Sequence, residues 1–263
     1  MNPLGKQPTL RLPPVFVVRA LWLGVALLVA IGLSSVVGRG VFTGDFATRA
    51  DPYRQRGMEA FHRQDPLAST RPAELDRFDR RFADAPFVTM LHILPGGLLL
   101  VLAPLQFSSR IRNRHIRFHR WSGRLLVGTA VVSTLAGLYF GLLMPYGGLG
   151  EAAATTLFGG ILLVSVIRAV AAIRRGQVAL HREWMIRAFA IVLGISMVRV
   201  VGPVFDLAFT PAGLPPRELF VLSLWTGWTL TLAAAEAWIR YTRVAVERPA
   251  FLSGAVGAEA SLQ

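Results

Sequence analysis

Residues 86–107 read PFVTMLHILPGGLLLVLAPLQF, and none of these side chains is acidic, lysine or arginine. A helix needs about 20 mostly apolar residues to cross the hydrocarbon core of a bilayer. The stretch therefore predicts a transmembrane helix. Five other stretches have similar length and character, namely residues 17–38, 122–143, 152–173, 184–206 and 218–239. The expected fold is all-α, a polytopic membrane bundle of about six transmembrane helices.

The composition agrees with a membrane location and excludes several kinds of catalytic and cofactor site. Hydrophobic residues make up 53% of the 263 residues and charged residues only 16%, whereas soluble domains carry about 25% charged residues. The chain has no cysteine, which excludes disulfides, thiolate nucleophiles, iron–sulfur clusters held by cysteine and c-type haem attachment. Hydrolase, zinc-protease, Walker and Rossmann motifs are absent from the sequence. Enzymatic activity is left open, and an independent catalyst is not the favoured interpretation.

The first apolar stretch could be cleaved or retained, and this decides how the chain is divided. It follows Lys6 and Arg11, so it could be a signal peptide, but it is longer than the usual apolar run of about 7–15 residues. We interpret it as a retained anchor. The expected parts are a cytoplasmic tail (1–16), the first anchor (17–38), an extracytoplasmic loop (39–85), a five-helix membrane core (86–240) and a cytoplasmic tail (241–263).

Arginines in the loops predict the orientation. Loop 109–121 carries five arginines and no acid, whereas loop 144–151 carries no basic residue. Arginine-rich loops stay in the cytoplasm, so both termini are predicted to be cytoplasmic. The net charge of +13 is then explained by contact with anionic lipid at the cytoplasmic face, and binding of nucleic acid is not expected.

We predict the structure of two segments outside the spans, a helix in the first loop and a disordered C-terminal tail. Within loop 39–85, Leu75, Phe78 and Phe82 recur at helical spacing after Pro72. This pattern predicts a short amphipathic helix on the outer membrane surface or over the bundle. The tail after Pro249 is small and polar, and we expect it to be disordered.

Ionisable residues inside membrane spans are rare and are candidates for function. His92 lies beside Pro95 and a Gly-Gly pair, and Arg199 is predicted at a similar depth in the outer half of the fifth span. A shared polar site is one interpretation, with Asp206 or Glu151 as further partners of Arg199. The alternatives are an interfacial histidine bonded to a neighbouring helix and an arginine that extends to the headgroups.

Two similar segments begin the third and fifth spans, HRWSGR at 119–124 and HREWMIR at 181–187. We predict that His119 and His181 converge at the inner face, although each could simply cap its own helix or face water. Arg187 and Glu236 are each placed about one turn inside a span, so we expect them to pair. The candidate cofactor-binding residues are His92, His119, His181, Arg124, Arg187 and Arg199, and the candidate metal ligands are His119, His181 and Glu183.

These ordered motifs resemble a family of bacterial predicted multi-pass membrane proteins that is catalogued as a domain of unknown function. The resemblance covers roughly residues 86–200 and includes His92-x-x-x-Gly96, His119-Arg120-x-x-Gly123-Arg124 and His181-Arg182-x-Trp184-Met185-x-Arg187. It implies a bacterial cytoplasmic membrane and signature positions at the three histidines, and it implies no activity.

Three functions remain open. The first is a histidine-based protein that binds b-type haem or a divalent metal and serves respiratory redox chemistry or oxidase maturation. The second binds or transports a small molecule or lipid. The third is a non-catalytic structural partner of other proteins in a membrane complex.

Overall fold

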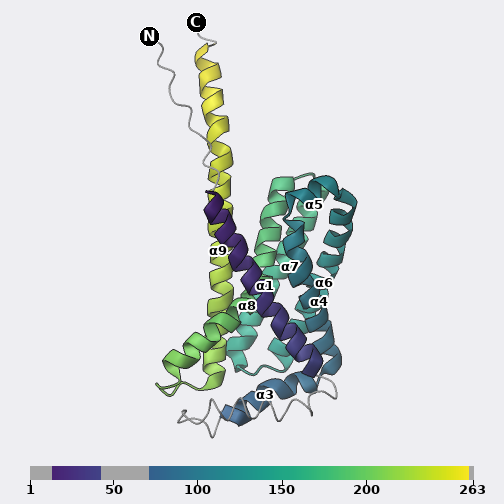
Figure 1. Cartoon of the computed structure of the whole chain (residues 1–263), viewed down its shortest axis with the longest axis vertical. Helices are drawn as coiled ribbons and strands as arrows, with labels where there is room; N and C mark the ends of the chain where they lie inside the picture. The colour runs from purple at the N-terminus through teal and green to yellow at the C-terminus, as the bar shows by residue number, and fades with distance from the viewer. Residues whose placement is uncertain (1–13, 43–70, 261–263) are drawn as a thin grey trace.

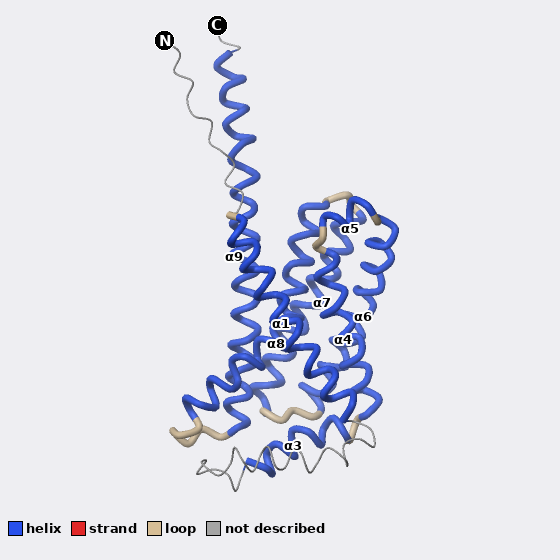
Figure 2. The backbone as a smooth tube through the Cα atoms, viewed as in Figure 1, coloured by secondary structure: helices blue, strands red, loops and turns tan. Residues whose placement is uncertain are grey.

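The structure is a computed structural model that describes residues 14–42 and 71–260, with the side chains of residues 14–37 and 77–243. The described residues are almost entirely helical, and the connections between the core helices are short (Figure 2). The helices are α1 (Val15–Phe42), α3 (Arg71–Ala83), α4 (Pro86–Gln106), α5 (Ser109–Arg114), α6 (Ile116–Leu143), α7 (Gly148–Arg174), α8 (Val178–Phe209) and α9 (Pro216–Ala260).

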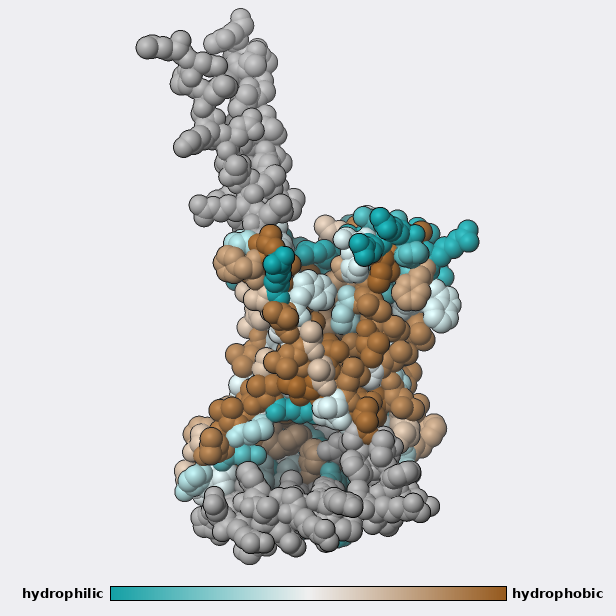
Figure 3. Space-filling view, in the orientation of Figure 1, coloured by the Kyte–Doolittle hydropathy of each residue, from teal (hydrophilic) through white to brown (hydrophobic). Residues whose placement is uncertain are grey.

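Six of these described helices are long and apolar enough to cross a membrane, namely α1, α4, α6, α7, α8 and the part of α9 up to Arg243. Their order and bounds confirm the predicted all-α polytopic bundle. An apolar band crosses the middle of the face seen in Figure 3, and hydrophilic residues gather on that face where α5 lies. We call the two ends of the bundle the α5 end and the α3 end.

Helices α4 to α9 form the body of the bundle, and α1 crosses one face of it obliquely (Figure 1). Helix α8 packs against both α7 and α9, while α4 packs mainly on α6. The crossing of α8 and α9 depends on small residues. Gly194 faces the indole of Trp228, and Gly227 faces Val198. Glycines allow this close approach because they have no side chain. Such tight packing matters within lipid, where apolar surfaces gain little from association alone.

The amphipathic segment of the first loop forms α3, as predicted. It lies across one end of the bundle (Figure 1). Phe78 and Phe82 contact each other edge to face, and Phe78 also contacts Tyr146 and Phe220. The third residue of the pattern, Leu75, lies outside the described side chains. Helix α3 is thus anchored on the bundle by its aromatic face.

The expectation for the C-terminal tail is wrong. Helix α9 continues past Pro249 to Ala260 and extends beyond the rest of the bundle (Figure 1). The segment AVGAEA at 255–260 is rich in alanine, the residue with the highest helix propensity. Small and polar residues were therefore a poor indicator of disorder here.

Candidate functional site

A cavity of about 580 Å³ lies inside the bundle, lined by residues of α1, α3, α4, α6, α7, α8 and α9. Most of its lining is aliphatic or aromatic. The charged residues and the histidine in the lining are Arg81, His92, Glu151, Arg199 and Asp206. The cavity therefore collects side chains from helices that are far apart in the sequence.

His92 is held in the cavity wall by reciprocal bonds between α4 and α6. Its Nδ1 lies 2.8 Å from the Ser133 carbonyl oxygen, and the Ser133 hydroxyl donates to the His92 carbonyl at 2.9 Å. A carbonyl only accepts, so Nδ1 carries the proton in this arrangement. The ring lies beside Gly137, where an added Cβ would come within 3.1 Å of Cε1. The glycine thus makes room for the imidazole.

Arg199 lines the same cavity and is half-buried. Its guanidinium donates to the Ile195 carbonyl at 2.7 Å, one turn earlier in α8. Asp206 also lines the cavity from α8. The structure therefore brings the two predicted residues of the outer half, His92 and Arg199, to one cavity.

One interpretation of the sequence paired Glu151 with Arg199. In the structure, Glu151 has a different partner. It receives a hydrogen bond from Arg81 of α3 at 2.6 Å, and the side chains are only 8% and 5% exposed. The second carboxylate oxygen accepts the Gly147 amide at 2.7 Å. The Arg81 guanidinium also lies over the rings of Phe78 and Phe82. This ion pair joins α3 to α7 beside the cavity.

Sequence reasoning missed Arg81, although a signal was present. Arg81 lies three residues after Phe78 and one before Phe82, so it belongs to the apolar face of the amphipathic helix. A charged residue on the buried face of such a helix needs a partner in the structure that it covers. The spacing marked Arg81 as different from Arg77 and Arg80, which are both exposed.

At the α5 end, His119 and His181 interact with each other electrostatically, and His119 also interacts with Arg112 and Arg120. Nδ1 of His119 is buried and has no hydrogen-bond partner among the described residues. Nδ1 of His181 lies 2.9 Å from the Ala169 carbonyl of α7. The two histidines, from α6 and α8, are thus within electrostatic range of each other, and Arg112 and Arg120 are within range of His119.

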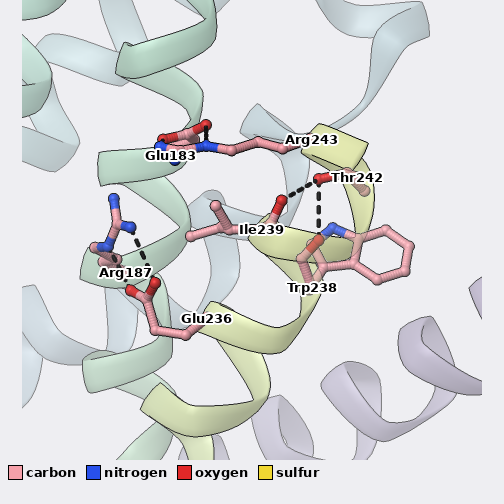
Figure 4. A network of polar contacts seen from close by, with 7 residues as sticks. All are labelled: Glu183, Arg187, Glu236, Trp238, Ile239, Thr242 and Arg243. Carbon is pink, nitrogen blue, oxygen red and sulfur yellow. Dashed lines mark hydrogen bonds and ion pairs between the residues drawn. The ribbon is translucent and has the colours of Figure 1, made fainter. Parts of the chain in front are cut away.

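The other predicted residues of this end are engaged in ion pairs or exposed. Arg187 donates to Glu236 at 2.5 and 3.0 Å, which confirms the expected pair, and it also lies over the Trp184 ring. Glu183 is bound by Arg243. Figure 4 shows these two parallel links between α8 and α9. Arg124 is exposed on α6. These contacts assign Arg187, Glu236, Glu183 and Arg243 to helix packing.

Among the described residues, no three His, Asp or Glu side chains come together as a group that could hold a metal ion. Glu183, the acidic member of the set considered from the sequence, already has a cationic partner in Arg243. Only His119 and His181 of that set show an interaction with each other.

Comparison with known families matches residues 89–239 to a family described as predicted membrane protein (DUF2306). This region contains the cavity walls from α4 to α9, whereas α1 and α3 precede it. Comparisons with curated proteins and with solved structures gave no match. Since the matched region covers more than half of the sequence, the chain belongs to the DUF2306 family of predicted membrane proteins, whose function is unknown.

Proposed function

We propose that the protein binds a small amphipathic molecule inside the membrane, with its apolar body in the cavity between α4, α6, α7 and α8. The observation that carries this proposal is the cavity of about 580 Å³. Ligand sites in proteins commonly measure about 300–1,000 Å³ and combine apolar walls with a few polar groups. A bare ion would not require such a volume or such a lining.

The lining changes character with depth, which indicates how the ligand lies. Glu151 is in the first turn of α7, and Leu162 is about 16 Å deeper at the helical rise of 1.5 Å per residue. His92 is about 9 Å from the start of α4, whereas Leu99 is about 20 Å from it. The ligand would therefore place its polar group toward the α3 end and its apolar body toward the middle of the bundle.

Photolabelling tests this proposal. A fatty acid that carries a diazirine in its chain has the required polar head and apolar body, and it is added to the full-length protein in lipid vesicles. The expected result is labelling of cavity residues that oleic acid suppresses at increasing concentration. Labelling that oleic acid does not suppress, or that is confined to the lipid-facing surface, would contradict the proposal.

Two adjacent glycines of α7 provide a matched control. Gly159 lines the cavity, whereas a Cβ at Gly160 would meet nothing within 4 Å. Gly159→Leu should remove most of the competable labelling, because the new side chain occupies the cavity, and Gly160→Leu should retain it. Equal thermal stability of the two variants would show that the loss is not caused by unfolding.

A histidine-based haem or metal site is the second candidate, and it is favoured by the interaction of His119 with His181. Two imidazoles are sufficient as axial ligands of a b-type haem, whereas a zinc ion usually takes at least three protein ligands. Haem is therefore the better candidate of the two. It predicts an absorption spectrum of the purified protein with a Soret band, and elemental analysis distinguishes a bound metal.

The proposed orientation places the α5 end in the cytoplasm of a bacterial inner membrane. Arg110, Arg112, Arg114, Arg117 and Arg120 lie at or beside α5 and are exposed. Clusters of this kind remain on the cytoplasmic side and attract anionic lipids. The polar end of the cavity then lies in the outer half of the bilayer.

A further inference from the structure

The cavity has two unlike covers, the helix α3 at its end and the helix α1 on its side. We infer that the ligand enters from the bilayer past α1, and that it is consequently a molecule dissolved in the membrane rather than one taken from water. This inference rests on the proposed function, because it concerns the ligand of the same cavity.

The cover at the α3 end is fastened by a buried ion pair. Phe78, Arg81 and Phe82 of α3 all line the cavity, and Arg81 is bound to Glu151. Lifting α3 would separate two charges whose side chains are less than one-tenth exposed. Separating a buried ion pair is costly when neither charge finds a new partner. Uptake through this end is therefore opposed by electrostatics.

The cover formed by α1 is held differently. Gly32, Ser35 and Val36 of α1 line the cavity, and Gly32 is the only buried residue among the described side chains of α1. The main contacts of this helix are with α4 and α8. Figure 1 shows it crossing the face of the bundle rather than inserting into it. One wall of the cavity is thus a helix whose other surface faces outward.

The contacts that seal α1 are close and largely apolar. A Cβ at Gly32 would lie 2.5 Å from the Ser196 hydroxyl and 2.6 Å from a methyl group of Leu100. Val36 packs on Gly97 of α4 in the same way. The hydroxyls of Ser34 and Ser35 both bond to the Ile31 carbonyl within α1. Lipid chains are as apolar as these surfaces, so parting them carries no hydrophobic penalty.

A reversible disulfide between α1 and α4 tests the route. A Cβ at Gly97 would lie 3.7 Å from the Cβ of Val36, and disulfides bridge Cβ atoms about 3.8 Å apart. The variant Val36→Cys/Gly97→Cys, in a chain that has no other cysteine, can be oxidised and reduced in the same vesicles. The rate of competable labelling by the diazirine fatty acid is then measured in both states.

A second disulfide serves as the matched control. A Cβ at Gly150 would also lie 3.7 Å from the Cβ of Val221, so Gly150→Cys/Val221→Cys joins α7 to α9 without touching α1. We expect oxidation to slow labelling by about tenfold or more, the effect of about 1.4 kcal/mol on a barrier, only when it ties α1. Reduction should restore the rate.

Other outcomes separate the route from the proposed function. Equal rates in the oxidised and reduced α1–α4 variant, with labelling still competed by oleic acid, would overturn the route and leave the binding site in place. The absence of competable labelling in the unmodified protein would overturn both. Gly97→Leu gives an independent check, because a larger side chain against Val36 should push α1 outward and accelerate uptake. An unchanged rate in this variant would also count against the route.

Discussion

Arg81 of α3 and Glu151 of α7 form a buried ion pair with an N–O distance of 2.6 Å. The residues are 70 positions apart, and their contact fixes the amphipathic helix of the first loop over the cavity. Three aromatic rings lie within 6 Å of the Arg81 guanidinium carbon, those of Phe78, Phe82 and Phe220. The pair is therefore a buried polar link between α3 and the membrane core.

Removal of one charge from this pair should destabilise the protein strongly. Arg81→Met leaves the Glu151 carboxylate buried without its cation, and such changes cost about 3–5 kcal/mol. The double variant Arg81→Met/Glu151→Leu removes both charges and should be more stable than Arg81→Met alone. Thermal unfolding in detergent gives the comparison. A double variant less stable than the single one would show that the ion pair itself has little influence.

Close packing of α8 on α9 predicts a specific sensitivity at Gly194. A Cβ at this position would lie 2.1 Å from the Trp228 ring, so Gly194→Val should lower the free energy of unfolding by about 1–3 kcal/mol or more. Gly128→Val is the control in α6, since a Cβ there would meet nothing within 4 Å. Equal losses of thermal stability in the two variants would contradict the observed helix crossing.

The orientation predicts opposite accessibility for two single cysteines. Leu149, at the start of α7, is 90% exposed, and Asn113 of α5 is also exposed. In intact cells with a permeable outer membrane, a membrane-impermeant maleimide should label Leu149→Cys and not Asn113→Cys. Disruption of the inner membrane should make both reactive. The reverse pattern would place the α5 end outside.

Any ligand shared by the two histidines of the α5 end should depend on both of them. If the purified protein shows a Soret band, His119→Ala and His181→Ala should each abolish it, because each removes one axial imidazole. His115→Ala is the control, since His115 is exposed at the junction of α5 and α6. Full retention of the band in either of the first two variants would exclude a shared ligand.

The spans and the amphipathic helix could be predicted because length and periodicity are local properties of the sequence. The Arg187–Glu236 pair also followed from depth, since both residues lie about one turn inside their spans at the same end of the bundle. The partner of Glu151 did not follow, because it depends on where α3 settles on the bundle. The cavity could not be predicted from the sequence either, since it reflects gaps left among the side chains of seven helices.

The central claim is that the cavity between α4, α6, α7 and α8 holds an apolar chain. A crystal structure of the protein with a fatty acid brominated near its methyl end tests this claim most directly, because the bromine marks the chain by anomalous scattering. We predict an anomalous peak inside the cavity near Leu99, Leu162 and Ile191, which line its deeper part. Peaks found only on the outer surface of the bundle, with the cavity free of bromine, would contradict the account.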